Sequence, residues 1–236
     1  MIGRLLTALN LFLLTSILLV VLVLSSLYLW LNQDLPQLPQ NLQHINLSLP
    51  TEIYSSDGER IKILGERHPI ALEDISPFFT KAIIGVEDSR FYSHSGIDHR
   101  GLVRALWTNF RQKRIAQGGS TITQQLSKNL FFSFERNWVR KIKERLIAFQ
   151  LEATFNKEQI LQAYCNQIYF GSGAYGVEEA AQIYFGKRAK DLTLLQAALL
   201  AGLPNSPNNA NPFSHYERAM QRTNYVLSRM VSENLI

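Results

Sequence analysis

Residues 118–129 read Gly-Gly-Ser-Thr-Ile-Thr-Gln-Gln-Leu-Ser-Lys-Asn, two glycines that lead into a hydroxyl-rich helix start. Thr121, followed three residues later by Gln124, is typical of a capping box. Gln125 and Lys128 follow Thr121 at spacings of four and seven, so these side chains share one side of the helix. A helix N-terminus with hydroxyls and a lysine on one face can hold a phosphate group. An ordinary capped surface helix explains the same residues, and the glycine spacing excludes a Walker loop.

A second polar stretch lies upstream, where residues 87–98 read Glu-Asp-Ser-Arg-Phe-Tyr-Ser-His-Ser-Gly-Ile-Asp. Glu87 and Asp88 close a predicted helix, and a carboxylate there faces the negative end of the helix dipole, which raises its pKa. That suits a general base, which must be ionised and yet accept a proton. The alternative is that either acid pairs with Lys81 or Arg90 on a solvated surface.

Two further stretches carry polar residues in a helical context. Residues 140–144 read Arg-Lys-Ile-Lys-Glu on the polar side of a long predicted helix. They equally fit a solvated face with an Arg140–Glu144 pair. Asn166 precedes the glycine-rich segment 171–176, where glycines would allow close backbone approach to a ligand or simply connect two helices.

Most of the chain carries a helical pattern of apolar residues. Helices are predicted at 77–89, 100–109, 121–130, 136–155, 157–168, 177–185, 193–203 and 215–233. Residues 51–64 predict a β-hairpin that turns at Asp57-Gly58. Residues 33–50 are polar, contain three prolines and predict an extended spacer. The sequence therefore predicts a mainly α domain with a small β-hairpin.

An apolar segment opens the chain, and residues 5–31 contain no charged side chain. As a helix it is long enough to cross the hydrocarbon core of a bilayer. Arg4 precedes it and Asp34 follows it, which places the N-terminus in the cytoplasm and the remaining chain outside. A cleaved signal peptide is the alternative, but the run is too long and lacks a small-x-small cleavage site. Residues 1–32 are therefore predicted to be a single transmembrane anchor.

Composition limits the class of protein. The chain is 46% hydrophobic and 18% charged, which is typical of a globular domain. A net charge of +5 suits an anionic membrane surface or a phosphorylated substrate, and no nucleic-acid-binding motif accompanies it. Cys165, the one cysteine, excludes an internal disulfide and is predicted to be a buried thiol because it lies in an apolar run.

The order of these motifs resembles the peptidoglycan glycosyltransferases, namely the monofunctional transglycosylases and the N-terminal domain of class A penicillin-binding proteins. The resemblance extends from about residue 53 to the C-terminus. Further along the chain it rests on Lys-Glu-Gln-Ile-Leu at 157–161, Tyr-Cys-Asn-Gln-Ile-Tyr-Phe-Gly at 164–171 and Ala-Ala-Leu-Leu-Ala-Gly-Leu-Pro at 197–204. Two positions depart from the family, Cys165 where leucine is usual and Gln162 where an acid is common.

The resemblance implies a lysozyme-like helical domain over residues 51–236, with a membrane-facing subdomain and lipid II as the substrate. Glu87 would be the catalytic base, and Glu144 a second catalytic acid that holds a divalent metal, Mg²⁺ or Mn²⁺. The implied substrate-binding residues are Lys128, Gln125, Ser120 and Thr121 at the donor site, with Arg104, Lys141 and Asn166 as further contacts. The implied partners are lipid II, the nascent glycan chain, membrane lipid and proteins of cell-wall synthesis or division, without nucleic acid.

The sequence leaves several alternatives open. One alternative is a lytic hydrolase of glycan strands, against which the Gly-Gly-Ser-Thr-Ile-Thr-Gln-Gln stretch at 118–125 strongly favours a polymerase. Another is a non-catalytic scaffold that binds lipid II, against which the presence of both Glu87 and Glu144 argues. The motifs do not choose between a monofunctional enzyme and the glycosyltransferase part of a bifunctional one. The large apolar residues Leu130, Phe131, Phe132, Phe134 and Trp138 are predicted to touch the membrane, and they could instead belong to the core.

Overall fold

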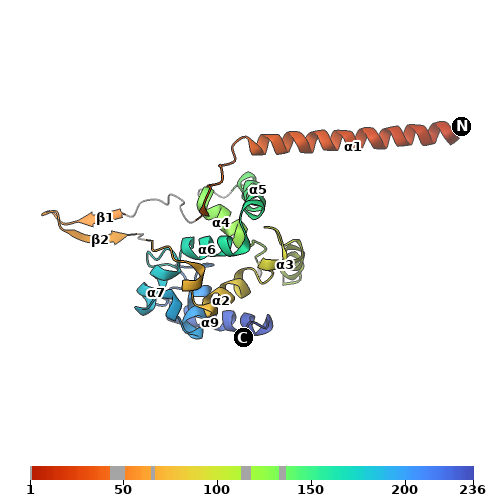
Figure 1. Cartoon of the computed structure of the whole chain (residues 1–236). Coiled ribbons are helices and arrows are strands. Elements are labelled where there is room, and N and C mark those ends of the chain that lie inside the picture. Colours follow the sequence, from red (N-terminus) through yellow and green to blue (C-terminus); the bar gives the residue numbers. More distant parts are fainter. Residues whose placement is uncertain (1, 43–50, 65–66, 113–117, 133–136) are drawn as a thin grey trace. The chain divides into compact units, whose positions relative to one another are not determined.

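The computed structural model describes residues 2–42, 51–64, 67–112, 118–132 and 137–236 (Figure 1). The chain divides into two compact units. The first contains Met1–Gln37 and Arg136–Lys143, and the second contains Leu38–Glu135 and Glu144–Ile236.

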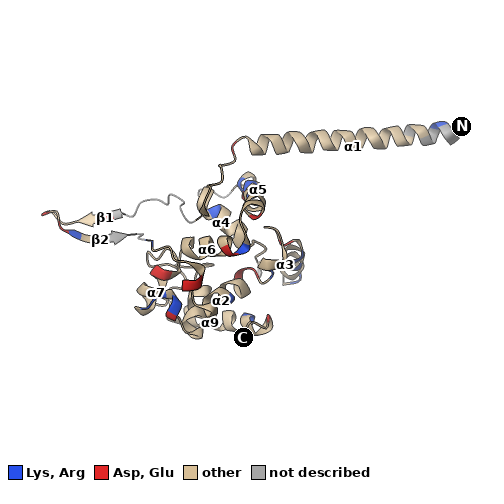
Figure 2. Ribbon diagram, viewed as in Figure 1, with Lys and Arg blue, Asp and Glu red and all other residues tan. Residues whose placement is uncertain are grey.

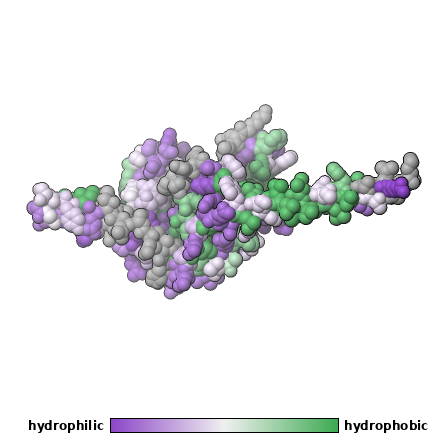
Figure 3. Space-filling view, turned by 90° about the horizontal axis from the view of Figure 1, so that it is seen from above, coloured by the Kyte–Doolittle hydropathy of each residue, from purple (hydrophilic) through white to green (hydrophobic). Residues whose placement is uncertain are grey.

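The first unit contains the long N-terminal helix α1 (Ile2–Asn32). Within it, Leu9–Asn32 has a mean hydropathy of 2.5 and is long and apolar enough to cross a membrane. Figure 2 shows basic colour on α1 only near its N-terminus, and Figure 3 shows hydrophobic residues along much of its length. The predicted apolar helix is confirmed, while its orientation across a membrane stays a prediction.

The second unit is built mainly from α-helices joined by short 3₁₀ turns. The helices are α2 (Pro77–Glu87), α3 (His99–Gln112), α4 (Ile122–Phe131), α5 (Trp138–Thr154, whose first residues belong to the first unit), α6 (Lys157–Gln167), α7 (Val177–Phe185), α8 (Leu194–Gly202) and α9 (Tyr216–Ser232). The 3₁₀ turns are η2 (Leu72–Asp74), η3 (Phe91–Ser93) and η4 (Ala189–Asp191). The predicted mainly helical class is confirmed, with helix ends that differ from prediction by a few residues.

The predicted hairpin is also present, with β1 (Thr51–Tyr54) antiparallel to β2 (Arg60–Leu64). Thr51 lies opposite Leu64, and the register shifts between Ile53 and Tyr54. Gly58 has a φ of +86°, a left-handed conformation that glycine adopts without a side-chain penalty. This residue explains why the Asp-Gly pair marks the turn.

The core forms where α2 packs against α8 and α9, and where α4 packs against α6. The largest fully buried side chains are Tyr164, Phe79, Phe91, Phe170, Ile83, Ile122, Leu126, Ile147, Leu151, Ile160, Leu161 and Leu200. They recur at helical spacing along their elements, so each helix buries one stripe. The end of α2 and the start of α4 are thereby held on the same core.

The start of α4 departs from the predicted capping box. The Thr121 hydroxyl accepts from the backbone N–H of Gln124 at 3.2 Å and donates to the carbonyl of Gly96 at 2.6 Å. The Gln124 side chain does not return to the cap but donates to the same Gly96 carbonyl at 3.4 Å. Half of the predicted box is therefore wrong, because the Gln124 side chain is directed to the buried carbonyl of Gly96.

We expect Thr121→Val to cost more stability than Thr193→Val, although both residues cap a helix. The Thr193 change removes an exposed cap and should cost about 1 kcal/mol. The Thr121 change also takes a hydrogen bond from the buried Gly96 carbonyl, so about 2–3 kcal/mol is expected. Urea unfolding of the detergent-solubilised chain measures both, and equal losses would contradict a role for the Gly96 contact.

Candidate functional site

The adjacent acids Glu87 and Asp88 occupy different environments. Asp88 is buried, and both of its oxygens lie 3.0 Å from Nε2 of His94. One of these oxygens also accepts from the backbone N–H of Ile122 at 3.1 Å. Asp88 therefore joins the C-terminal end of α2 to the N-terminal end of α4, and its hydrogen-bonding capacity is largely used by the protein.

Glu87 is the last residue of α2 and keeps one oxygen free of hydrogen bonds. Its Oε2 accepts from Nε2 of Gln125 at 2.7 Å. Its Oε1 is buried and has no hydrogen-bond partner within the described part of the chain. The Tyr164 hydroxyl donates to Oε1 of Gln125 at 3.1 Å, which turns the amide so that its N–H faces Glu87. Glu87 is thus positioned rigidly by one oxygen, while the other is available to a proton.

The solvated pairing considered for these acids is not what the structure shows. Arg90 pairs instead with Asp98 at 3.3 Å. Lys81 donates to the backbone carbonyl of Leu235 at 3.2 Å. The two cations are therefore engaged elsewhere, which leaves Glu87 to interact with α4.

The pKa of Glu87 is raised above that of an ordinary glutamate, chiefly because burial disfavours the charged form. The hydrogen bond from Gln125 and the positive charges of Arg222 and Lys128 lower it, and the neighbouring Asp88 charge raises it. The predicted direction is confirmed, with burial as its largest cause. A carboxylate in this setting accepts a proton more readily than an exposed one.

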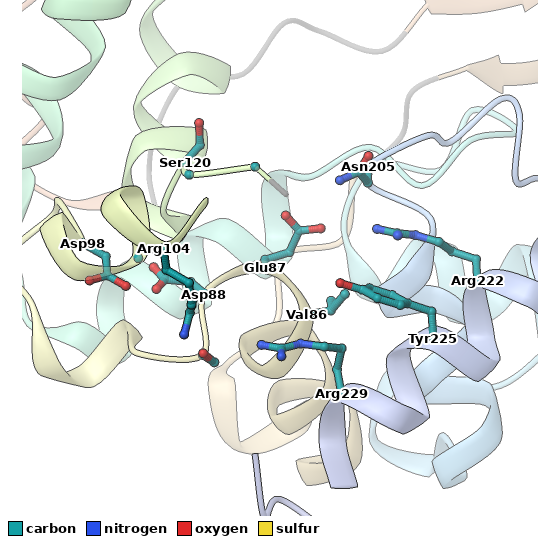
Figure 4. Close-up of a pocket in the computed structure, with 14 residues that line it drawn as sticks. Val86, Glu87, Asp88, Asp98, Arg104, Ser120, Asn205, Arg222, Tyr225 and Arg229 are labelled. Carbon is teal, nitrogen blue, oxygen red and sulfur yellow. The ribbon is translucent and has the colours of Figure 1, made fainter. Parts of the chain in front are cut away.

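Glu87 faces a small cavity of about 110 Å³ that we term the arginine cavity. Figure 4 shows Arg222, Tyr225 and Arg229 projecting into this region from α9. The remaining lining residues include Asp88, Asp98, Arg104, Ser120 and Asn205. The predicted residues Glu87, Arg104 and Ser120 thus meet in one place.

The sequence did not predict that residues of α9 belong to the site. Arg222, Tyr225 and Arg229 follow one another at spacings of three and four, which places them on one helix face. That spacing was the feature of the sequence that could have indicated these residues. It was not decisive, because arginines on one face of a helix usually lie on a solvated surface.

A second cavity of about 350 Å³ is lined in part by Gln125, and we term it the tyrosine cavity. Gln125 and Lys128 reach it from α4, and Tyr169 and Tyr175 form part of its wall, with ring centroids 4.7 Å apart. Arg67, Phe132 and Gln167 are also among its lining residues. Because Gln125 lines this cavity and binds Glu87 of the arginine cavity, its side chain connects the two walls.

Two predicted substrate-binding residues are occupied by contacts within the protein. Thr121 is buried as the cap of α4. Asn166 is 7% exposed, and its amide accepts from the backbone N–H of Ile70 at 3.2 Å and donates to the carbonyl of Ile70 at 2.8 Å. Thr121 stabilises the start of α4, and Asn166 stabilises the segment around Ile70. Both segments contribute residues to the cavity walls. Contact of either residue with a substrate stays a prediction.

The predicted metal site at Glu144 does not have a preformed set of protein ligands. Glu144 is 0% exposed, and the described residues contain no group of three or more His, Cys, Asp or Glu side chains that could hold an ion. A divalent ion would have to take most of its ligands from a substrate or water. These residues do not fit a resident metal centre, and the metal stays a prediction. Lys141 belongs to the first unit, so its position relative to the cavities is likewise a prediction.

The apolar residues from Leu130 to Trp138 have mixed surroundings. Phe131 and Phe132 are half-buried, and Phe132 contributes to the tyrosine cavity. Trp138 is exposed, whereas Phe134 lies outside the described residues. Contact of this segment with a membrane stays a prediction. Cys165 is a free, buried cysteine, as the sequence predicted.

Comparisons with known proteins agree on one group. A family model described as Transglycosylase matches residues 57–231. Penicillin-binding protein 1A of Aquifex aeolicus (strain VF5) is 48% identical over 206 residues, which cover 86% of this chain and 28% of that protein. The protein of the same name from Escherichia coli (strain K12) is 47% identical over 205 residues, covering 85% of this chain and 24% of that protein.

A solved structure is also similar. The crystal structure of penicillin-binding protein 1A from Haemophilus influenzae matches with a TM-score of 0.47 and 28% identity, covering 81% of this chain and 19% of that one. The chain spans about a quarter of the length of the curated relatives described above.

We expect Gln125→Leu to raise the pKa of Glu87 further, because the hydrogen bond that stabilises the ionised carboxylate is lost. Titration of ¹³C-labelled glutamate side chains by NMR measures this directly, with Glu87→Gln identifying the signal. Gln124→Leu is the matched control, since Gln124 contacts Gly96 instead. An unchanged Glu87 pKa in Gln125→Leu would show that this hydrogen bond does not control the carboxylate.

Proposed function

This chain belongs to the transglycosylase family, and from that premise we propose that it is a peptidoglycan glycosyltransferase that polymerises lipid II into glycan strands. The observation that carries the proposal is the state of Glu87. One oxygen is fixed by Gln125, the other is buried and has no hydrogen-bond partner among the described residues, and burial raises the pKa. A proton acceptor of this kind faces a cavity whose lining includes three arginines.

The proposed reaction is a single inverting displacement. The 4-hydroxyl oxygen of the acceptor sugar attacks the anomeric carbon of the donor and forms the new glycosidic bond. The bond from that carbon to the lipid diphosphate breaks, and the bonding electrons leave with the diphosphate. Glu87 takes the hydroxyl proton at its free oxygen. Because the hydroxyl oxygen attacks the face opposite the leaving diphosphate, the α linkage of the donor becomes a β linkage.

Cations rather than an acid would assist the leaving group, because a diphosphate departs as a stable anion. Lys128 in the tyrosine cavity and the arginines of the arginine cavity supply positive charge near Glu87. Positive charge that is already oriented stabilises the negative charge that develops in the transition state. We derive no step from the metal predicted at Glu144, because the described residues form no site for it.

The contacts of the other two acids of the arginine cavity favour transfer over glycan hydrolysis. Hydrolysis of a glycoside ordinarily needs a second carboxyl group that protonates the leaving oxygen. Asp88 is engaged by His94 and Ile122, and Asp98 pairs with Arg90. Glu87 is thus the acid whose free oxygen is best placed to act, which fits a reaction whose leaving group needs no proton.

We expect Glu87→Gln to lower the rate of polymer synthesis by about a hundredfold or more, because an amide cannot act as the base. The melting temperature at neutral pH should be unchanged or higher, since the substitution removes a buried charge whose ionisation is unfavourable. Labelled lipid II with the full chain in detergent gives the rate, and gel separation of the glycan gives the chain length.

The control for this experiment is Glu59→Gln, which changes a carboxylate of the hairpin connection that is exposed. It should polymerise at the normal rate. Near-normal glycan synthesis by Glu87→Gln would contradict the assignment of Glu87 as the base. Release of soluble sugar fragments by the wild type would support the hydrolase instead.

The proposal also places the second unit at a bilayer, on the outer face of the cytoplasmic membrane, with α1 as the single-pass anchor. Helix α3 supports this view, since Val103, Leu106, Trp107 and Phe110 are all exposed at spacings of three and four. Trp107 is 67% and Phe110 81% exposed, and such residues on one helix face suit a membrane interface.

Basic residues accompany this apolar stripe on α3. Arg100, Arg104 and Arg111 are exposed and separated by four and seven residues, so they share a neighbouring face of the helix. Anionic headgroups match a basic row beside an apolar stripe. Because Arg104 also lines the arginine cavity, docking of α3 would bring that cavity to the level of the headgroups.

We expect Trp107 to be quenched by brominated lipid when the full chain is reconstituted in nanodiscs with phosphatidylglycerol. Trp30 and Trp138 are replaced by phenylalanine, so Trp107 is the only reporter. The matched control carries Trp107→Phe and Leu195→Trp in the same background, because Leu195 is also exposed but lies on α8. Equal quenching at both positions would contradict docking through α3.

A further inference from the structure

Arg67 is fixed at the wall of the tyrosine cavity by contacts from two directions. Its Nη1 donates to Oε1 of Gln167 at 2.6 Å, and its guanidinium carbon lies 4.6 Å from the centre of the Tyr175 ring. The segment that follows is held by Asn166, whose amide binds both backbone groups of Ile70. The guanidinium therefore has a defined position, with one face on an aromatic ring.

The donors of Arg67 are not fully used by the protein. Nε is buried and has no hydrogen-bond partner in the described ranges. No carboxylate of those ranges forms an ion pair with this guanidinium either. Burial lowers the pKa of Arg67, which reflects the cost of holding its positive charge away from water. An anion that entered the cavity would relieve that cost by pairing with the guanidinium charge.

We infer that Arg67 is an anion-binding residue of the tyrosine cavity and that it receives the diphosphate group of a lipid-linked sugar substrate. The identity of the substrate rests on the proposed function, whereas the anion site rests on the contacts of Arg67. The ligand class is a diphosphate because Arg67 and Lys128 line the same cavity. Two cations match a multiply charged group better than a single carboxylate, and a guanidinium edge can bind two phosphate oxygens at once.

The position of this site fits the proposed chemistry. Gln125 also lines the tyrosine cavity, and its amide holds the carboxylate of Glu87. A diphosphate bound there would place the attached sugar near the proposed base. Tyr169 and Tyr175 supply aromatic surface in the same wall. Arg67 would thus be a binding residue that positions one of the two substrates.

The test measures binding of inorganic pyrophosphate to the full chain in neutral detergent by isothermal titration calorimetry. Arg67→Gln should weaken binding at least tenfold, and Arg67→Lys should recover part of it because the charge remains without the planar fork. Each variant is also made with Arg222→Gln, which removes one of the three arginines of the arginine cavity and so weakens competing binding there. Arg188→Gln, an exposed arginine beside Asp74, is the matched control and should bind within twofold of wild type.

Two results would overturn the inference. Pyrophosphate binding within twofold of wild type in folded Arg67→Gln would make this residue purely structural. If that variant does not fold, the same result in folded Arg67→Met, which also lacks the charge, decides the question. Acetate that competes as well as pyrophosphate would identify a carboxylate site. Because binding requires no turnover, a chain that failed to polymerise lipid II would refute the proposed function and leave this result standing.

Discussion

The hydrogen-bonded chain from Tyr164 through Gln125 to Glu87 is the interaction on which the site depends. It links α6, α4 and α2, and the Tyr164 hydroxyl sets the direction of the Gln125 amide. The amide in turn holds one oxygen of Glu87 and leaves the other without a partner among the described residues. Burial of this carboxylate is unfavourable, and nearby positive charge partly offsets the cost. General-base chemistry requires a carboxylate that is held in position and whose raised pKa lets it accept a proton.

Asp88 shows how neighbouring acids can take separate roles. Its contacts with His94 and Ile122 keep the ends of α2 and α4 together, so Glu87 and Gln125 meet. Helix α9 packs on α2 and contributes Arg222 and Arg229 to the arginine cavity, whereas α4 contributes Lys128 to the tyrosine cavity. Two cavities, one lined by Glu87 and the other by its partner Gln125, suit a reaction between two large substrates.

The sequence was sufficient for the elements and for much of the site. Periodicity and turn residues placed the helices and the hairpin, and the motif order indicated Glu87, Gln125 and Lys128. It could not show which contacts Thr121 and Asn166 make, because Gly96 and Ile70 are distant in sequence and are brought near by packing. The same limit hid Arg222, Arg229 and Arg67, whose charges acquire a role only when helices or loops far apart in the chain enclose a cavity.

The central claim is that the buried carboxylate of Glu87 is the base, and the dependence of kcat on pH tests it most directly. The rate of lipid II polymerisation should fall as the pH decreases through the raised pKa of Glu87, because the protonated acid cannot accept the hydroxyl proton. The account predicts that this acid limb lies above the usual range for glutamate and coincides with the Glu87 pKa measured by NMR on the enzyme–substrate complex. An acid limb that differs from that pKa would contradict it.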